Sequence, residues 1–241
     1  MERGSPVFCA IDTPSLEAAQ KLAGELAGLV GGFKLGLEFF CANGPEGVRA
    51  VAASGSPIFL DLKLHDIPNT VGGAVRGLVR LKPAFITVHA AGGRAMLTTA
   101  MAAAREAAES LGVERPRLLA TTVMTSLDES DLHDIGQDPV PEHQVDRLAF
   151  LSQDAGLDGV ICSAKEIGHL RRRYGPHFTL MVPGIRPAWS TQDDQKRVLG
   201  PAEALALGAH YLVIGRPITR ATDPADAARR IHQELLATEA E

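Results

Sequence analysis

The chain has 241 residues, of which 45% are hydrophobic and 22% charged, and its formal net charge is −5. This negative balance argues against nucleic acid or an anionic membrane as a partner, and no apolar run approaches the roughly 18 residues that a spanning helix needs. The three cysteines (Cys9, Cys41, Cys162) are scattered, and no signal-peptide core precedes the first apolar segment. We therefore expect reduced thiols and a cytoplasmic protein.

Apolar segments with strand character alternate with segments of helical periodicity along the whole chain. The first strand covers residues 7–12, and helical spacing of apolar residues follows over 16–30. In chain order, further strands are predicted at 33–37, 58–64, 85–89, 118–124, 159–162, 179–182 and 211–214. The helices between and after them are predicted at about 45–53, 70–81, 94–110, 142–155, 165–174, 201–207 and 223–236.

Eight apolar strands alternating with helices at a spacing of about thirty residues predict a single (β/α)₈ barrel over residues 1–241. Such a barrel typically takes about 250 residues, and no stretch of this chain resembles a linker. The competing architecture is a doubly wound open sheet. That fold usually has a glycine-rich turn after its first strand, whereas this chain has Asp-Thr-Pro-Ser at residues 12–15.

The stretch from Asp61 to Thr70 concentrates charge at the end of a buried strand. Side chains alternate along a strand, so Asp61 and Lys63 are expected on one face and the neighbouring leucines on the other. Asp66 follows just beyond the strand. Buried charge is costly unless it is paired. A structural ion pair is one interpretation, and an active site is the interpretation that we favour.

Other polar groups follow the remaining predicted strands, where barrel enzymes carry their chemistry. They are Asp12, Lys34, His89, Thr125-Ser126, Arg186 and Gly215-Arg216. Glycine and arginine after the last strand indicate phosphate binding. The polar loop over 184–198 is long enough to act as a lid, with Gln195 and Arg186 as its ligand contacts. For Arg186 a solvated surface position is the alternative.

Lys34, Asp61, Lys63 and Asp66 could form an alternating array of cations and anions. Mutual pairing would keep these groups charged in a dry pocket. Asp61 could then repel a substrate carboxylate, while Lys63 donates a proton to a carbanion. This chemistry suits decarboxylation without a cofactor. The remaining polar side chains are expected on the pocket wall or in structural roles (His65, His89) or at the surface (Asp158, His169).

The stretch Asp-Leu-Lys-Leu-His-Asp-Ile-Pro-Asn-Thr at 61–70 resembles the signature of the orotidine 5′-monophosphate decarboxylase family. The similarity covers nearly the whole chain. It includes Ile11-Asp12, Lys34-Leu35-Gly36, Val88-His89-Ala90, Thr125-Ser126, Pro183-Gly184-Ile185-Arg186-Pro187, Asp194-Gln195 and Ile214-Gly215-Arg216-Pro217. The resemblance implies a homodimeric (β/α)₈ barrel that converts orotidine 5′-monophosphate to UMP and CO₂ in de novo pyrimidine biosynthesis, without a cofactor or a metal.

The resemblance also implies residue roles. Asp61 would lie against the scissile carboxylate, Lys63 would protonate C6 of the pyrimidine, and Lys34 would connect Asp61 to the ribose end of the site. Asp66 and Thr70 would contact substrate in the partner subunit's site. Further substrate contacts would be Asp12 with a ribose hydroxyl, Thr125 (or Ser126) with the pyrimidine edge, Gln195, Gly215 and Arg216 with the phosphate, and Arg186 at the lid.

Two other functions remain open at this point. A magnesium-dependent sugar-phosphate decarboxylase or aldolase of the same barrel superfamily would share the Asp-x-Lys-x-x-Asp pattern but carry an acid at the end of the second strand. This chain has Lys34 there, and an ammonium group would repel Mg²⁺. A catalytically silent nucleotide-binding barrel would be expected to lose Asp61 or Lys63, and both are present.

Overall fold

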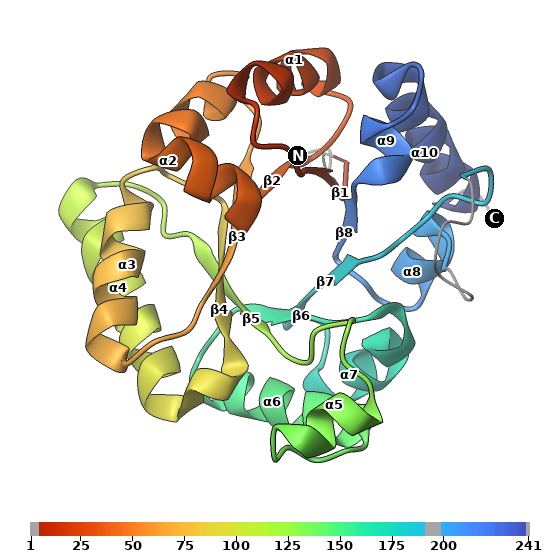
Figure 1. Cartoon of the computed structure of the whole chain (residues 1–241). Coiled ribbons are helices and arrows are strands. Elements are labelled where there is room, and N and C mark those ends of the chain that lie inside the picture. The colour runs from red at the N-terminus through yellow and green to blue at the C-terminus, as the bar shows by residue number, and fades with distance from the viewer. Residues whose placement is uncertain (1–4, 191–198, 240–241) are drawn as a thin grey trace. The chain divides into compact units, whose positions relative to one another are not determined.

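The computed structural model describes residues 5–190 and 199–239. Within these residues, strands β1 to β8 follow one another in sequence order as a closed barrel with parallel pairing (Figure 1). The strands are β1 Val7–Ile11, β2 Gly32–Gly36, β3 Ile58–Leu64, β4 Phe85–His89, β5 Arg117–Thr121, β6 Gly159–Ile161, β7 Thr179–Pro183 and β8 Tyr211–Ile214. The predicted (β/α)₈ fold is confirmed.

Helices follow the strands as the barrel pattern requires. They are α1 Leu16–Leu26, α2 Leu37–Ala52, α3 Pro68–Val79, α4 Gly93–Leu111, α5 Glu129–Asp134, α6 Pro141–Asp154, α7 Ile167–Tyr174, α8 Pro201–Ala206, α9 Arg216–Thr219 and α10 Pro224–Glu239. Short 3₁₀ turns precede α4 and α7: η1 Ala90–Gly92 and η2 Ala164–Glu166. None of the helices in the described part of the chain is both long and apolar enough to cross a membrane.

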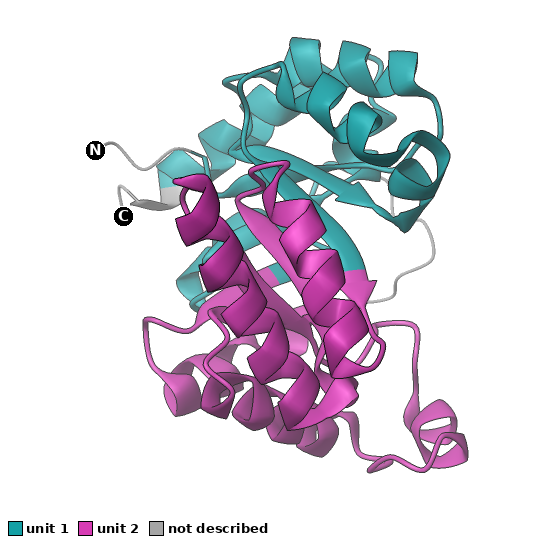
Figure 2. Ribbon diagram, turned by 90° about the vertical axis from the view of Figure 1, so that its left-hand side faces the viewer, with its two compact units in different colours: residues 1–62, 182–241 teal, residues 63–181 magenta. Residues whose placement is uncertain are grey.

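The chain divides into two compact units, shown in different colours in Figure 2. The first unit is Met1–Leu62 with Val182–Glu241, and the second is Lys63–Met181. The two boundaries fall inside β3, after Leu62, and inside β7, after Met181. The expectation of one domain over 1–241 stays a prediction.

The core of the first unit is built on β1, which pairs in parallel with both β2 and β8. The ring of Phe8 on β1 meets Phe59 and Tyr211 edge to face, at centroid distances of 6.2 and 5.6 Å. Such perpendicular aromatic pairs are a favourable geometry for ring quadrupoles. The apolar strand residues are therefore the interior that the sequence pattern predicts.

The second unit pairs β4 with β5, β5 with β6 and β6 with β7, all in parallel. Its helices α3 and α4 pack closely on one another. Gly72 on α3 allows this approach, since a Cβ there would lie 3.1 Å from Cγ2 of Thr99 and 3.8 Å from Cβ of Ala103. Several alanines of α4 are also buried: Ala100, Ala103, Ala104 and Ala108.

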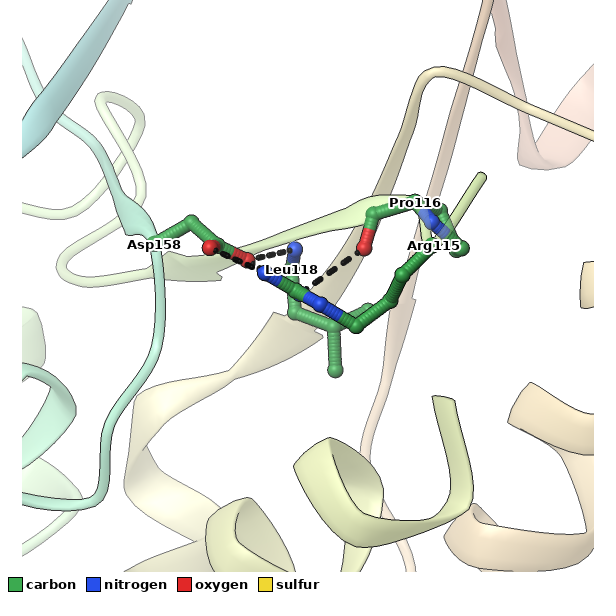
Figure 3. Close-up of polar contacts among 4 residues, drawn as sticks. All are labelled: Arg115, Pro116, Leu118 and Asp158. Atoms are coloured by element: carbon green, nitrogen blue, oxygen red, sulfur yellow. Dashed lines mark hydrogen bonds and ion pairs between the residues drawn. The ribbon is translucent and has the colours of Figure 1, made fainter. Parts of the chain in front are cut away.

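An ion pair fixes the start of β5 in this unit (Figure 3). Nη1 and Nη2 of Arg115 donate to the carboxylate of Asp158, at 2.8 and 2.7 Å. The same carboxylate accepts the backbone N–H of Leu118 at 2.7 Å. The predicted surface position of Asp158 is wrong, because this paired carboxylate is mostly buried. The other residue predicted at the surface, His169, is half exposed and contacts Asp146.

Some helices differ from the prediction for local reasons. Helix α5 lies in a stretch predicted to be irregular; Asp128 caps it by accepting from the N–H groups of Ser130 and Asp131, while Leu132 alone among its residues is buried. A helix with so little apolar surface has no hydrophobic periodicity to detect. Helix α2 begins earlier than predicted and is bent at Gly44, where φ is +60°.

Candidate active site

In the first unit, Lys34 on β2 lies within ion-pair distance of two carboxylates. Its Nζ donates a hydrogen bond to Oδ1 of Asp12 at 2.9 Å and lies 3.8 Å from Oδ2 of Asp61. The side chains of Lys34 and Asp61 are only 11% and 14% exposed, so their charges interact more strongly than charges in open water do. The predicted association of Lys34 with Asp61 is present, and Asp12 joins it.

Two glycines keep the space around this group open. A Cβ on Gly36 would lie 3.2 Å from Nζ of Lys34, and one on Gly215 would lie 3.9 Å from Oδ2 of Asp12. Gly215 therefore lies beside Asp12, and Arg216, which follows it at the start of α9, is exposed. One of the predicted phosphate-binding residues therefore lies next to the predicted ribose-binding residue.

Burial lowers the reactivity of Cys9, a thiol whose pKa is also affected by Asp12 and Lys34. Cys9 lies inside β1 with no exposed surface. Its pKa is raised to about 12, first by burial and then by the charge of Asp12, although Lys34 acts in the opposite direction. A protonated thiol is a poor nucleophile. Cys9 is thus a core residue, while Cys162 is buried and Cys41 exposed, and all three are free thiols.

In the second unit, Lys63 has an unusual backbone. Its φ is +48°, and among the described residues only Lys82 shares a positive φ without being glycine. The left-handed region costs an ordinary residue about 1–2 kcal/mol. Lys63 therefore lies within β3 but departs from regular strand geometry at its own φ.

A buried hydroxyl contacts this residue. The backbone N–H of Lys63 donates to Oγ1 of Thr87 on β4 at 2.9 Å, and Thr87 has no exposed surface. Thr87 is not among the site residues that we predicted from the sequence. The sequence feature that could have pointed to Thr87 is its hydroxyl within the otherwise apolar strand Phe-Ile-Thr-Val-His at 85–89.

The two histidines that follow these strands stack on each other. The rings of His65 and His89 are 5.1 Å apart at an interplanar angle of 16°. Nδ1 of His89 accepts the N–H of Ala91 at 3.3 Å. The pKa of His89 is lowered by burial first, and then by the nearby His65 and Lys63. The structural or pocket-wall role expected for His65 and His89 stays a prediction.

Asp66 and Thr70 are both exposed. Asp66 precedes α3, and Thr70 lies in its first turn. Oδ1 of Asp66 accepts the N–H of Ile67 at 2.6 Å. Ile67 itself is 66% exposed, a large apolar side chain in open solvent within this chain.

Arg186 is 9% exposed, so the surface position considered for it is wrong. The backbone N–H of Arg186 donates to the backbone carbonyl of Leu199 at 3.3 Å, and this bond brings together the two ends of the loop after β7. Trp189 also lies in this loop, and the guanidinium of Arg230 on α10 is 4.1 Å from the centre of its ring. Gln195, the other predicted lid residue, lies outside the described residues.

Thr125 and Ser126 are both exposed in a turn after β5, which ends at Thr121 rather than at residue 124. Within 5–190 and 199–239, no cluster of three or more His, Cys, Asp and Glu side chains has an arrangement that could hold a metal ion.

The fold and these residues define a class: a (β/α)₈-barrel enzyme with charged acid and base side chains at strand ends, where barrel enzymes carry their catalytic groups. The comparisons with known proteins narrow this class. A family model described as Orotidine 5′-phosphate decarboxylase / HUMPS family matches residues 5–231, and the chain belongs to this family.

Similar proteins cover almost the whole chain. Orotidine 5′-phosphate decarboxylase of Paramagnetospirillum magneticum is 54% identical over 96% of this chain and 98% of its own length. That of Moorella thermoacetica is 51% identical over 98% of this chain and 94% of its own. A crystal structure of the Lactobacillus acidophilus orotidine 5′-phosphate decarboxylase superposes with a TM-score of 0.85 at 36% identity, covering 96% of this chain and 99% of that one. The predicted family and the predicted enzyme class, a carboxy-lyase, are confirmed.

Proposed function

We propose that this chain decarboxylates orotidine 5′-monophosphate to UMP and CO₂, a step of de novo pyrimidine biosynthesis, in the cytoplasm and without a cofactor. Membership of the family and the names of relatives more than 50% identical support the reaction. The observation that carries the proposal within this chain is Lys34, with Nζ 2.9 Å from Asp12 and 3.8 Å from Asp61.

In the proposed mechanism, Asp61 lies against the substrate carboxylate and Lys63 lies near C6. Two like charges in a poorly solvated site raise the energy of the bound substrate, and this repulsion disappears as CO₂ leaves. The bond between C6 and the carboxyl carbon breaks, and its electron pair stays on C6. The ammonium of Lys63 gives a proton to C6.

Lys34 has a positioning role in this mechanism. Asp61 must keep its negative charge although its side chain is only 14% exposed. The Lys34 ammonium, 3.8 Å from this carboxylate, offsets part of the cost of burying its charge. Because the same ammonium also holds Asp12, we propose that it connects the carboxylate end of the substrate to its ribose end.

The remaining substrate contacts are assigned by the same proposal. Asp12 binds a ribose hydroxyl, and Gly215 and Arg216 bind the phosphate. The lack of a side chain on Gly215 beside Asp12 supports this arrangement, since the backbone can approach a phosphate there. The other proposed contacts are Thr125 or Ser126 with the pyrimidine edge, and Gln195 and Arg186 with the phosphate from the loop after β7.

We further propose a homodimer in which Asp66 and Thr70 reach the partner subunit's substrate. Their exposure beside Ile67, whose side chain is 66% exposed, supports an interface at this end of α3. Large exposed apolar side chains rimmed by polar residues are typical of protein–protein contacts.

A substrate comparison tests the proposed reaction. The purified protein is incubated separately with orotidine 5′-monophosphate and with a 3-keto sugar phosphate plus Mg²⁺, and decarboxylation of each is followed. We expect turnover of the nucleotide only, because Lys34 occupies the strand-two position where the magnesium enzymes carry an acid. Turnover of the sugar phosphate alone would refute the proposal, and inactivity on both would favour a silent nucleotide-binding barrel.

A further inference from the structure

Lys63 has a backbone conformation that lysine, like other residues with a side chain, does not favour. A positive φ, here +48°, is unusual for a residue with a side chain, and it occurs inside β3. Lys82, the other such residue among those described, lies in the connection between α3 and β4, where turns commonly adopt this region. Something in the surrounding structure must therefore hold Lys63 in this state.

Thr87 is placed to do so. Its Oγ1 accepts the N–H of Lys63 at 2.9 Å, and its side chain is fully buried on β4, the strand beside β3. Threonine is branched at Cβ, so its hydroxyl has few positions available. A buried N–H without an acceptor is costly, and this contact therefore selects backbone conformations of Lys63 that keep the bond.

The direction in which a side chain leaves the backbone depends on φ at that residue. A change at Lys63 would move its Cβ and, along a flexible four-carbon chain, its ammonium group. We infer that Thr87 is a positioning residue for the Lys63 ammonium: its hydroxyl holds the Lys63 N–H and thereby fixes where the ammonium approaches the substrate. This inference rests on the proposed function, in which Lys63 is the proton donor.

The test compares substitutions of Thr87 that separate its hydroxyl from its shape. Thr87→Val keeps the branched shape and loses the acceptor, whereas Thr87→Ser keeps the acceptor. We expect Thr87→Val to lower kcat for orotidine 5′-monophosphate by about tenfold to 100-fold, the range that a misplacement of up to about 1 Å produces. KM and the affinity for UMP should stay within about threefold of wild type, because binding at the phosphate and ribose is remote from Lys63.

The rescue and the control complete the experiment. Thr87→Ser should keep kcat within about threefold of wild type, since its hydroxyl still accepts the N–H. Thr121→Val on β5 is the matched control, because Thr121 is also buried but its hydroxyl has no hydrogen-bond partner among the described residues. This variant should retain the wild-type kcat. If Thr87→Val does not fold, the comparison between Thr87→Ala (slow) and Thr87→Ser (fast) takes its place.

The outcomes separate this inference from the proposed function. A normal kcat in Thr87→Val, an equal loss in Thr87→Ser, or a loss confined to KM would overturn the positioning role while leaving the reaction intact. An inactive wild-type protein would overturn the proposed function, and this inference with it.

Discussion

Replacing Lys63 with glycine or alanine isolates the strain stored at this position. Both substitutions remove the amine, so a difference in stability between them reports the backbone alone. At a φ of +48°, alanine bears a left-handed penalty of about 1–2 kcal/mol that glycine does not. Glycine loses about 0.5–1 kcal/mol more chain entropy on folding. We therefore expect Lys63→Gly to be more stable than Lys63→Ala by about 0.5–1 kcal/mol.

Urea denaturation followed by circular dichroism measures this difference, and thermal unfolding should show a Tm higher by about 1–4 °C for the glycine variant. Lys21, exposed in the middle of α1, provides the control. There alanine should be more stable than glycine by about 1 kcal/mol, the usual helix preference. If alanine were also the more stable residue at position 63, the strain at Lys63, and the reason for a residue that holds it, would be refuted.

Other parts of the structure give further predictions. Mixing inactive Lys63→Ala with inactive Asp66→Asn subunits should restore partial activity, because a heterodimer then contains one intact shared site; absence of recovery despite demonstrated subunit exchange would contradict a role for Asp66 across the interface. Asp158→Asn should lower the free energy of unfolding by about 2 kcal/mol, because it breaks a mostly buried charged pair, whereas Glu106→Gln in an exposed pair should change it by less than about 0.5 kcal/mol. The lowered pKa of His89 means that unfolding takes up a proton below about pH 6.5, so stability should fall as the pH drops from 7 towards 5, and His89→Asn should reduce that fall in urea titrations. An unchanged pH dependence in His89→Asn would contradict this origin.

The strands were predictable because buried parallel strands are continuous apolar runs between turn residues. The strands predicted at 85–89 and 211–214 coincide with β4 and β8. The order of eight strands and helices followed from this spacing. Helix α5 was missed because its stability depends on the cap at Asp128 rather than on an apolar stripe.

The candidate site was predictable as a set of residues but not as a geometry. Charges at strand ends were visible in the sequence, and Lys34 does lie beside Asp61. The left-handed backbone of Lys63 and its bond to Thr87 were not, because they depend on a neighbouring strand 24 positions away in the chain. Asp158 was misjudged for the same reason, since its partner Arg115 is 43 positions away.

Release of labelled CO₂ tests the central claim most directly. Protein pretreated with EDTA is incubated with orotidine 5′-monophosphate carrying ¹⁴C in its carboxylate, and the Lys63→Ala variant is run in parallel. We expect one equivalent of ¹⁴CO₂ for each UMP formed by the wild type, and release by the variant that is lower by several orders of magnitude. Comparable release from both proteins would contradict Lys63 as the proton donor, and no release from the wild type would contradict the proposed reaction.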